Sequence, residues 1–464
     1  MLQIPSDIFR AYDIRGVAET ELTADFVQVL GEACGQFFRE AGERRVVVGR
    51  DNRLSSERIF RDLTMGLAAA GCEILDLGVT VTPIFYYARI HWEINAGVMI
   101  TASHNPGEFN GFKITLGPGT LYGEAIQKLR VYSETIGAKW SNRPHRPKIT
   151  TVDLSDAYIQ MVEGKIRLGE RRPKIAVDCG NGAAGGCAGP LFSRLGCEPL
   201  LLYAELDGRF PNHHPNPVKE RNLRDLAERV KREGCDLGVA FDGDGDRLGV
   251  VDECGRMIRA DRLMVLFWRE ILAKHPGADC IIEVKCSQAL VDEVERLGGR
   301  ACFYKTGHSF IKAKMRELGA PFAGEMSGHM FFADEYYGYD DALYAAARLL
   351  RILSKTELPL SRLLMDLPDY PSTGETHIPC SDQAKFRIVR ELTERLRRRF
   401  PLIDVDGVRV VFPEGWALAR ASNTEPAIVA RCEGMNGQAL DGICRLIKGE
   451  LASFPEVGEF EWER

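Results

Sequence analysis

The sequence predicts an α/β protein in which three related α/β domains precede a smaller C-terminal α+β domain. Two observations support this fold class. A short apolar strand that ends in a polar loop and leads into helix-like sequence occurs at residues 46–51, 175–180 and 281–286. Each copy precedes a second apolar strand that also ends in a polar loop, at residues 97–103, 238–242 and 321–327. Three copies of one α/β domain explain this recurrence economically.

The pattern changes near the C-terminus, where short turns are expected to join the strands. We expect strands at 408–412, 416–420 and 427–431, and helices at 384–399 and 437–451. Polar or proline-containing stretches near 141–147, 253–255 and 368–372 indicate domain boundaries. The expected domains are residues 1–147, 148–254, 255–368 and 369–464.

Composition describes an ordinary globular protein. The 464 residues are 45% hydrophobic and 27% charged, which fits several domains. The formal net charge of −6 gives no electrostatic argument for nucleic acid, and the arginines within 395–399 fit the solvent-exposed face of a helix. No apolar run approaches a membrane-spanning length, and the first residues lack a basic region followed by an apolar core. We expect neither a nucleic acid nor a membrane as a partner.

Cysteine usage indicates a reducing compartment. The thirteen cysteines are dispersed, their number is odd, and no two of them form a CxxC pair. Such usage is typical of reduced, mostly buried thiols. We therefore expect a cytoplasmic protein, and we expect a monomer.

The most informative motif is a loop in which three aspartates, Asp242, Asp244 and Asp246, alternate with glycines between two apolar runs. In extended chain, alternate side chains point the same way, so the three carboxylates can converge on one ion. The glycines allow the backbone to curl around it. Hard oxygen ligands suit Mg²⁺, Mn²⁺ or Ca²⁺. The loop is therefore interpreted as a divalent-cation site.

Two alternatives compete with that interpretation. Glu253 stands at the twelfth position of a loop that starts at Asp242, as in an EF-hand. The sixth position, however, is Arg247 instead of glycine, and the flanking runs are too short for helices. A solvated acidic turn is the other alternative. An octahedral Mg²⁺ site with positions open for a phosphate explains the loop better.

Two further loops follow apolar strands. Residues 101–106 contain Ser103 beside His104, but adjacent side chains in extended chain point in opposite directions, so His104 need not act as a base for Ser103. An Asn-Pro turn in which Ser103 bonds only backbone is the competing interpretation. Residues 180–185 formally contain GxGxxG, which is typical of a dinucleotide site but equally of a tight strand-to-helix turn.

The last two loops carry groups that bind sugars and phosphates. Glu325, Ser327 and His329 lie close together in sequence and suit vicinal sugar hydroxyls. The other loop, residues 420–426, offers a guanidinium, hydroxyls and an amide for a phosphate dianion, from Arg420, Ser422, Asn423 and Thr424. A buried polar turn and a surface turn are the plainer interpretations. Together with the aspartate loop and the serine, however, the four segments indicate a phosphorylated sugar as ligand.

These motifs resemble those of the bacterial phosphomannomutase/phosphoglucomutase family of the α-D-phosphohexomutase superfamily. The resemblance covers essentially the whole chain and rests on five motifs in the family's order, at residues 9–16 (FRAYDIRG), 101–106 (TASHNP), 242–247 (DGDGDR), 324–329 (GEMSGH) and 420–426 (RASNTEP). It implies three mixed-sheet α/β domains and a distinct fourth domain around a central active-site cleft. One departure is Asn216, where the family commonly has an acidic residue.

The resemblance also implies an isomerase that reversibly interconverts the 1-phosphates and 6-phosphates of mannose and glucose. Ser103 would be a phosphoserine, and Asp242, Asp244 and Asp246 would hold Mg²⁺ together with an oxygen of its phosphate. Phosphoryl transfer to the substrate would give a bisphosphorylated sugar, which turns over and returns its other phosphate to Ser103. Glucose 1,6-bisphosphate or mannose 1,6-bisphosphate would be the activator. Mg²⁺ and Arg247 would neutralise charge on the transferring group.

The remaining site residues are also carried over from the family motifs. Lys113 and His104 are the candidates for proton transfer, and Arg15 and Tyr12 would line the phosphoryl position. The substrate contacts would come from the other motif residues: Lys285, His308, Glu325, Ser327, His329, Arg420, Ser422, Asn423 and Thr424.

Three other functions stay open. A phosphoglucosamine mutase would share most of these residues, but Met326 favours the mannose/glucose branch, because the glucosamine branch typically has glutamine there. A metal-dependent sugar phosphatase would phosphorylate Ser103 transiently and use water as acceptor. A non-enzymatic metal-binding protein would carry no phosphate on Ser103.

Overall fold

The computed structural model describes residues 2–141, 145–422 and 426–463. The chain packs as two compact units. The first comprises Met1–Ala260, His308–Ala313 and Ser327–Leu363, and the second comprises Asp261–Gly307, Lys314–Met326 and Leu364–Arg464. None of the described helices has the length and apolar composition needed to cross a lipid bilayer.

The first sheet has the strand order β1-β5-β4-β2-β3-β7, and β6 extends it beside β5. Strands β4, β2, β3 and β7 pair in parallel, whereas β5 is antiparallel to both β4 and β1. The strands are β1 (Ile14–Val17), β2 (Arg45–Arg50), β3 (Glu73–Val79), β4 (Ala96–Ile100), β5 (Phe109–Leu116), β6 (Gly119–Thr120) and β7 (Ile149–Thr151). The helices are α1 (Ala24–Glu40), α2 (Ser56–Ala69), α3 (Thr82–His91) and α4 (Glu124–Gly137).

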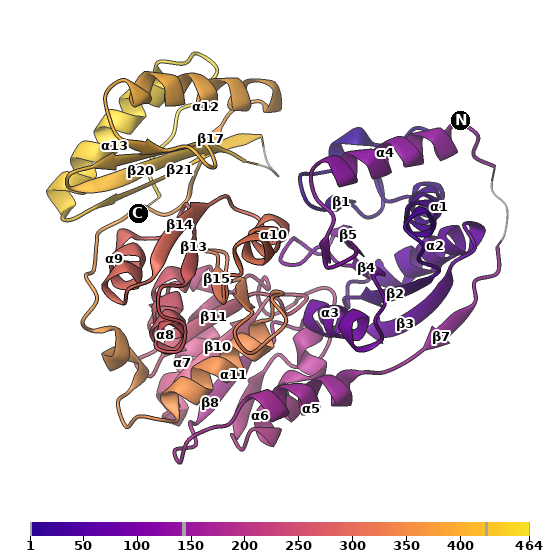
Figure 1. The fold of residues 1–464 in the computed structure, drawn as a ribbon, viewed down its shortest axis with the longest axis horizontal. Coiled ribbons are helices and arrows are strands. Elements are labelled where there is room, and N and C mark those ends of the chain that lie inside the picture. Colours follow the sequence, from indigo (N-terminus) through magenta and orange to yellow (C-terminus); the bar gives the residue numbers. More distant parts are fainter. Residues whose placement is uncertain (1, 142–144, 423–425, 464) are drawn as a thin grey trace. The chain divides into compact units, whose positions relative to one another are not determined.

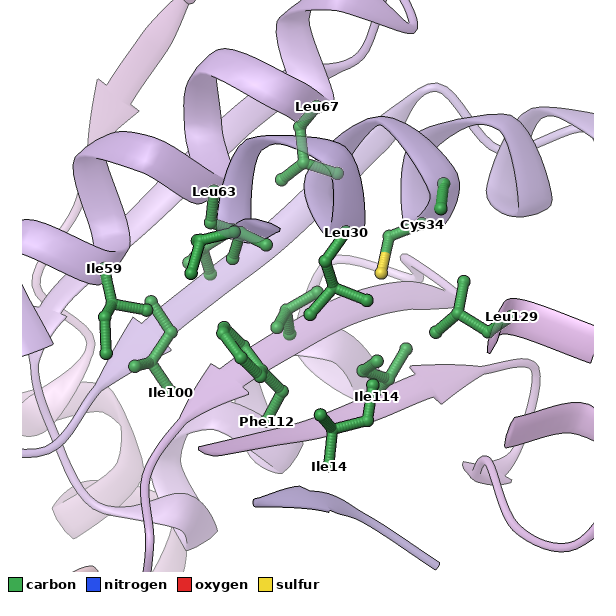
Figure 2. Close-up of a cluster of buried hydrophobic side chains, with 14 of the residues drawn as sticks. Ile14, Leu30, Cys34, Ile59, Leu63, Leu67, Ile100, Phe112, Ile114 and Leu129 are labelled. Carbon is green, nitrogen blue, oxygen red and sulfur yellow. The ribbon is translucent and has the colours of Figure 1, made fainter. Parts of the chain in front are cut away.

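Helices α1 and α2 pack against each other over one face of this sheet (Figure 1). Glycines allow the close approach: a Cβ on Gly31 would lie 2.3 Å from the carbonyl oxygen of Leu63, and one on Gly66 would lie 2.0 Å from that of Gln28. Figure 2 shows the core beneath them, where side chains of both helices meet those of β4 and β5. Each fully buried aliphatic or aromatic side chain there stabilises the fold by about 1.5–3 kcal/mol.

The second sheet has the order β12-β11-β10-β8-β9, in which β10, β8 and β9 are parallel and β11 is antiparallel to β10. Its strands are β8 (Ile175–Asp178), β9 (Pro199–Leu202), β10 (Leu237–Phe241), β11 (Leu248–Asp252) and β12 (Met257–Ile258). The helices of this part of the chain are α5 (Ser155–Lys165), α6 (Ala188–Arg194) and α7 (Arg224–Glu233).

The third α/β segment places β13 between β14 and β15, both parallel to it. Its elements are α8 (Ala260–Leu272), β13 (Asp279–Glu283), α9 (Gln288–Arg296), β14 (Arg300–Tyr304), α10 (His308–Leu318), β15 (Phe322–Gly324), β16 (Met330–Phe332) and α11 (Ala342–Leu353). Short 3₁₀ helices occur at Ser6–Ile8, Ala183–Gly186, Glu220–Leu223 and Leu360–Leu364.

The three α/β segments share one topology. In each, the first strand of the repeat lies in the centre, flanked in parallel by the second and third strands: β3-β2-β4, β9-β8-β10 and β14-β13-β15. The carboxyl ends of parallel strands meet at one edge of a sheet, and the loops that follow β4, β10 and β15 carry the polar motifs found in the sequence. The predicted fold class of three related α/β domains is confirmed.

The C-terminal segment forms an antiparallel sheet of order β17-β21-β20-β19-β18. Its elements are β17 (Thr376–Pro379), α12 (Asp382–Arg397), β18 (Leu402–Ile403), β19 (Val408–Phe412), β20 (Gly415–Ala421), β21 (Ala427–Gly434) and α13 (Gly437–Ala452). Both helices lie on one face of the sheet (Figure 1). Ser381 and Asn436 cap their N-termini by accepting hydrogen bonds from backbone amides. The predicted α+β domain is confirmed.

The predicted domain boundaries stay predictions. Two short strands lie just beyond two of them. Strand β7, at Ile149–Thr151, pairs with β3 of the first sheet, and β12, at Met257–Ile258, pairs with β11 of the second sheet.

Candidate active site

The three aspartates of the predicted metal loop lie in a tight turn between the antiparallel strands β10 and β11. Gly245 has a φ of 74°, a left-handed conformation that glycine adopts without strain. Asp242, Asp244 and Asp246 are fully buried, and each offers a carboxylate oxygen within 4.8 Å of those of the other two. The carboxylates therefore converge as predicted, although the turn brings them together and not an extended chain.

Only one buried ammonium, that of Lys113 on β5, bonds directly to this loop among the described residues. Its Nζ donates to Asp244 Oδ2 at 2.6 Å and also to Asp246. Burial, and then the charges of its two neighbours, raises the pKa of Asp242 to about 8, and burial followed by the charge of Asp244 raises the pKa of Asp246 to about 7. Burial disfavours the charged form of Lys113, but the carboxylates of Asp244 and Asp246 outweigh it and raise its pKa well above the ordinary value.

The loop fits a divalent cation. Asp244 Oδ1 and Asp246 Oδ1 are buried and have no hydrogen-bond partner within the described part of the chain. Three buried carboxylates face one bonded ammonium, that of Lys113, and one more distant guanidinium, that of Arg247. This leaves surplus negative charge, which a hard cation with oxygen ligands neutralises. A second group of possible ligands joins Asp246 to His329 and Asp340. It suits a cation less well, because His329 Nε2 accepts a hydrogen bond from Arg247, so that in the neutral ring the proton lies on Nδ1, the nitrogen that faces Asp246 and Asp340.

Ser103 lies in the turn that follows β4 and is almost fully buried. Its Oγ donates to Asp242 Oδ2 at 2.6 Å, and its backbone N–H donates to Thr101 Oγ1 at 2.8 Å. Its φ of 51° is left-handed, which is uncommon for a residue other than glycine. The serine hydroxyl thus points to the metal loop. The left-handed backbone of Ser103 is strained, and strained backbone is common at functional sites.

His104 lies on the other side of the serine hydroxyl, with Nδ1 3.2 Å from Ser103 Oγ. The expectation that these adjacent side chains point apart is wrong, because Ser103 is left-handed and not extended. Arg247 Nη1 lies 3.4 Å from His104 Nε2 and can only donate, so Nε2 accepts. Burial, and then the charges of Arg247 and Arg15, lowers the pKa of His104 well below its ordinary value. In the neutral ring Nδ1 carries the proton and donates to Ser103 Oγ.

Arg247 connects the metal loop to His329. Its Nε donates to His329 Nε2 at 3.1 Å and lies 3.8 Å from Asp242 Oδ2. His329 Nδ1 lies 3.1 Å from Asp340 Oδ2 and 3.5 Å from Asp246 Oδ1. The structure thus places His329 beside the carboxylates, in the first unit, whereas Glu325 of the same motif belongs to the second unit.

Arg15 lies in β1, and Tyr12 precedes this strand. Both belong to the first unit. Arg15 Nη1 donates to Asn105 Oδ1 at 2.7 Å, next to the serine turn, and Nη2 donates to Asp13 Oδ2 at 2.6 Å. The ring of Tyr12 meets that of His308 edge-on, with centroids 5.3 Å apart. Arg15 therefore lies against the loop that carries Ser103.

Beneath His308 lies a buried polar network that the sequence did not reveal. Lys312 Nζ donates to Asp340 Oδ1 at 2.7 Å and to Tyr86 OH at 2.9 Å, and it lies 3.1 Å from His308 Nδ1. The rings of His308 and His329 stack, with centroids 5.6 Å apart. Burial, and then the charge of Lys312, lowers the pKa of His308 well below its ordinary value. The network holds both imidazoles in place.

The second unit contains other residues of the predicted site, and it pairs their charges. Lys285 Nζ donates to Glu375 Oε1 at 2.9 Å, and Arg420 Nε donates to Asp406 Oδ2 at 2.8 Å. Burial disfavours the charged ammonium of Lys285, but Glu283 and Glu375 raise its pKa above the ordinary value. Burial likewise opposes ionisation of Glu375, yet Lys285 lowers its pKa to about 2.

The segment before α10 joins these pairs to Glu325. The Gly307 N–H donates to Glu325 Oε1 at 2.6 Å, and the Thr306 N–H donates to Asp406 Oδ2 at 3.1 Å. Thr306 Oγ1 also donates to Glu283 Oε1 at 2.6 Å. Lys285, Glu325 and Arg420 therefore belong to one connected polar region of the second unit.

Four predicted residues remain. Ser422 is buried, and its N–H donates to the Ala427 carbonyl at 2.9 Å. Ser327 is half-buried and belongs to the first unit. Asn423 and Thr424 lie outside the described residues.

The structure bears on the alternative interpretations of two loops, the aspartate loop and the GxGxxG segment. Glu253 accepts a hydrogen bond from the Ser361 N–H at 3.1 Å, and the aspartate loop is flanked by strands, so the EF-hand interpretation is wrong. In the GxGxxG segment, a Cβ on Gly185 would lie 2.0 Å from the Ala204 carbonyl oxygen, and one on Gly182 would lie 3.0 Å from Gly243 Cα. These close contacts support a tight turn packed against the metal loop.

Comparisons with known proteins agree with this arrangement. Models of the phosphoglucomutase/phosphomannomutase alpha/beta/alpha domains I, II and III match residues 6–137, 156–255 and 259–370, and the C-terminal domain model matches residues 375–448. A phosphomannomutase/phosphoglucomutase of Pseudomonas putida is 44% identical over 449 residues, which cover 97% of this chain and 96% of the relative. A phosphoglucomutase of Neisseria gonorrhoeae is 42% identical over 461 residues, covering 98% and 99%.

A solved structure leads to the same family. The phosphoglucomutase/phosphomannomutase family protein from Burkholderia thailandensis superposes with a TM-score of 0.89 at 40% identity, covering 98% of this chain and 99% of the other. Four domain models, full-length relatives and this structure confirm the resemblance seen in the motifs. The chain belongs to the phosphoglucomutase/phosphomannomutase family of the α-D-phosphohexomutase superfamily, and it is an isomerase of the phosphoryl-transferring mutase class.

Proposed function

We propose that this chain reversibly interconverts the 1-phosphates and 6-phosphates of mannose and glucose by phosphoryl transfer through Ser103. The observation that carries the proposal is the 2.6 Å hydrogen bond from Ser103 Oγ to Asp242, in a buried loop of three carboxylates. A stored phosphoryl group on this oxygen would lie beside a cation held by Asp242, Asp244 and Asp246. The name of the Pseudomonas putida relative supports the pair of sugars.

Magnesium is the cation we propose, because carboxylate oxygens and phosphate are its preferred ligands. When bound, it would neutralise negative charge on the transferring phosphoryl group. The residues of the chain would do the rest. Arg247 and Arg15 flank the serine turn and supply further positive charge, which phosphoryl transfer requires because charge spreads over the equatorial oxygens.

The proposed reaction exchanges one phosphate ester for another. A free hydroxyl of the hexose phosphate attacks the phosphorus on Ser103, the bond from phosphorus to Ser103 Oγ breaks, and a bisphosphorylated sugar forms. In the second half, the other phosphate of that sugar returns to Ser103, so phosphate is conserved. Glucose 1,6-bisphosphate or mannose 1,6-bisphosphate would restore a dephosphorylated serine.

The hydrogen bonds of His104 and Lys113, the two candidates for proton transfer, support a different role for each. The His104 Nδ1–H donates to Ser103 Oγ, so His104 is arranged to stabilise the leaving oxygen. Lys113 stays protonated because Asp244 and Asp246 raise its pKa, so in this arrangement it contributes positive charge instead of accepting a proton. Removal of the sugar hydroxyl's proton by either residue stays a prediction.

The remaining predicted residues are proposed to bind the substrate. Arg420 and Ser422 would hold the phosphate that is not reacting, together with Asn423 and Thr424. Glu325 and Ser327 would accept and donate hydrogen bonds with ring hydroxyls that glucose and mannose share. Those hydroxyls do not include the C2 group, which explains why both sugars would be accepted. Lys285, His308, His329 and Tyr12 would make further contacts.

We also propose a cytoplasmic location. All thirteen cysteines lie within the described residues and none forms a disulfide, and Cys254 is the only exposed one. Thiols persist where the compartment is reducing. A monomer without nucleic-acid or membrane partners stays a prediction.

The test compares wild-type protein with Ser103→Ala. Wild-type protein incubated with glucose 1,6-bisphosphate is expected to gain one phosphoryl group in its intact mass, and Ser103→Ala is expected to gain none. The variant is expected to lose mutase activity on glucose 1-phosphate and mannose 1-phosphate to the background of the assay. Ser133→Ala is the matched control, because Ser133 is also buried but bonds only the Leu129 carbonyl.

Three results would contradict the proposal. Full activity of Ser103→Ala would exclude the phosphoserine mechanism. Release of inorganic phosphate from mannose 1-phosphate, without formation of the 6-phosphate, would instead support the sugar phosphatase. A clear preference for glucosamine 1-phosphate would favour the phosphoglucosamine mutase.

A further inference from the structure

We infer that Arg53 is a positioning residue for phosphoryl transfer, because its guanidinium holds the turn that carries Ser103. The inference rests on the proposed role of Ser103. Arg53 follows β2, whereas the serine turn follows β4, and the two strands pair in parallel. Arg53 belongs to none of the five sequence motifs.

The hydrogen bonds of Arg53 use its full donor capacity. A guanidinium has five N–H donors. Nη1 donates to the carbonyls of Pro106 and Phe109 at 2.6 and 3.0 Å. Nη2 donates to the carbonyls of Ser103 and Asn105 at 2.9 and 2.6 Å. Nε makes the fifth bond, so four carbonyls of one turn converge on a single side chain.

Asp51 fixes the direction of this guanidinium. Arg53 Nε donates to Asp51 Oδ2 at 3.0 Å, and Asp51 Oδ1 accepts from the Arg53 N–H and from Ser56 Oγ, at 3.1 and 2.6 Å. Ser56 is the first residue of α2, and it also accepts from Asn110 Nδ2 at 3.0 Å. The arginine is therefore anchored to Asp51, the residue that directly follows β2, and through it to the first turn of α2.

A second observation connects Arg53 to the metal loop. The Ser103 carbonyl that accepts from Arg53 also faces Gly243, where a Cβ would lie only 2.6 Å from its oxygen. The guanidinium lies over the ring of Phe210, 5.3 Å from the centroid, and Phe210 reaches toward Gly243 as well. The serine turn thus lies between Arg53 and the backbone of the aspartate loop.

This arrangement explains how Ser103 keeps its left-handed backbone. Such a conformation persists only where the surroundings over-determine it. Bonds to the carbonyls of Ser103 and Asn105 hold the turn on both sides of His104. The position of Ser103 Oγ relative to Asp242 depends on that turn, and a shift of about 1 Å at a reacting group can cost about 100-fold in rate.

Arg53 itself is 2% exposed, and all five donors are used within the protein. Its loss should therefore lower kcat and leave KM nearly unchanged. Lysine keeps the charge but has only three donors on one atom, so it cannot reproduce the fork.

The experiment compares wild type, Arg53→Lys and Arg89→Lys. Arg89 is the matched control, because it is 8% exposed and donates to the carbonyls of Asn95 and Gly117, away from the serine turn. Mutase kinetics with glucose 1-phosphate, melting temperature, and amide hydrogen exchange of the peptide covering 101–112 are measured for each. Asp51→Asn is a milder variant that retains Arg53 and serves if Arg53→Lys does not fold.

We expect Arg53→Lys to lose about 10- to 100-fold in kcat with little change in KM. Exchange in 101–112 should accelerate, and Asp51→Asn should change in the same direction by less. Arg89→Lys should retain its kcat and the exchange of that peptide. A kcat for Arg53→Lys equal to that of Arg89→Lys, or a fall in kcat without faster exchange in 101–112, would overturn the inference. Wild type without mutase activity would instead refute the proposed function, whatever the exchange shows.

Discussion

The metal loop of the first unit and the Lys285–Arg420 region of the second unit both bury charged groups, but they balance the charge in different ways. In the metal loop, Asp244 and Asp246 share the ammonium of Lys113, and Asp242 has only the more distant guanidinium of Arg247, at 3.8 Å. In the second region, each cation has its own carboxylate: Lys285 pairs with Glu375, and Arg420 with Asp406.

The difference agrees with the ligand that we propose for each region. Surplus negative charge in a buried site is costly unless a cation neutralises it, so the first region is suited to a resident metal. In the second region, both cations are already paired with carboxylates. A phosphate that binds there must take donors from Glu375 and Asp406, which suits a ligand that arrives, turns over and leaves.

The largest effect is expected for Asp244→Asn, which removes one carboxylate of the first region. Activity should fall about 10²–10³-fold, the magnitude typical for loss of one electrostatic contact to a transition state. The variant should also need more Mg²⁺ for half-maximal activity. Activity is measured across an Mg²⁺ titration after chelation with EDTA.

Asp341→Asn is the control for that variant. Asp341 is also a fully buried carboxylate, but it accepts from Tyr158, Tyr336 and the Tyr344 N–H, outside the metal loop. Its Mg²⁺ requirement should equal that of wild type. An unchanged Mg²⁺ requirement in Asp244→Asn would show that the loop does not hold the metal.

A smaller effect is expected for Arg420→Lys in the second region. Lysine keeps the charge but loses the forked donors that bind a phosphate, so KM for glucose 1-phosphate should rise about tenfold, equivalent to about 1.4 kcal/mol. The kcat should change little. Arg387→Lys serves as control, because Arg387 is a half-buried arginine of α12 that pairs with Glu391. A rise in KM for both variants would mean that Arg420 has no special role.

The smallest effect is a pH dependence of stability in metal-free protein. The pKa values of Asp242 and Asp246, about 8 and about 7, are raised above those of the unfolded chain. A raised pKa contributes stability at low pH that is lost as pH rises through the folded value. The melting temperature in EDTA should therefore fall as the pH rises from about 4, near the pKa of an unfolded aspartate, to about 8, the folded pKa of Asp242, by roughly 2–4 °C per kcal/mol lost.

Magnesium should remove that decline, because it neutralises the same carboxylates. Glu375 acts in the opposite direction: its pKa of about 2 lies below the unfolded value, so its contribution is present above about pH 4.5 and is lost only in acid. A decline between about pH 4 and 8 that persists in Mg²⁺ would place its origin outside the metal loop.

Much of the fold could be predicted because it depends on local patterns. Strand β19 was expected at 408–412 and occupies Val408–Phe412, and helix α13 was expected at 437–451 and occupies Gly437–Ala452. Apolar runs bounded by glycines and polar residues indicate such elements wherever they stand. The short strands β7 and β12 were not expected, because two or three residues carry no detectable period.

The candidate site was predicted only in part, for a related reason. Residue type and spacing were enough to identify Asp242, Asp244 and Asp246 as candidate ligands. Arg53 and Asp340 could not be identified in this way, because a single arginine or aspartate in a loop is also typical of an ordinary surface turn. The available signal for Arg53 was its position in the loop after β2, the central strand of the first repeat. In the second repeat, the corresponding loop follows the central strand β8.

The order of residues was sufficient to establish three repeated α/β segments, a distinct C-terminal segment and five polar motifs. Each of these depends on periodicity and side-chain chemistry within a short stretch. Only the packed structure determined which groups meet. Lys113 reaches Asp244 across 131 positions of sequence, and Ser103 reaches Asp242 across 139. The direction of the hydrogen bond at His104 follows from Arg247, a residue of another sheet. Contacts of this kind depend on how two sheets pack, and no local pattern records that packing.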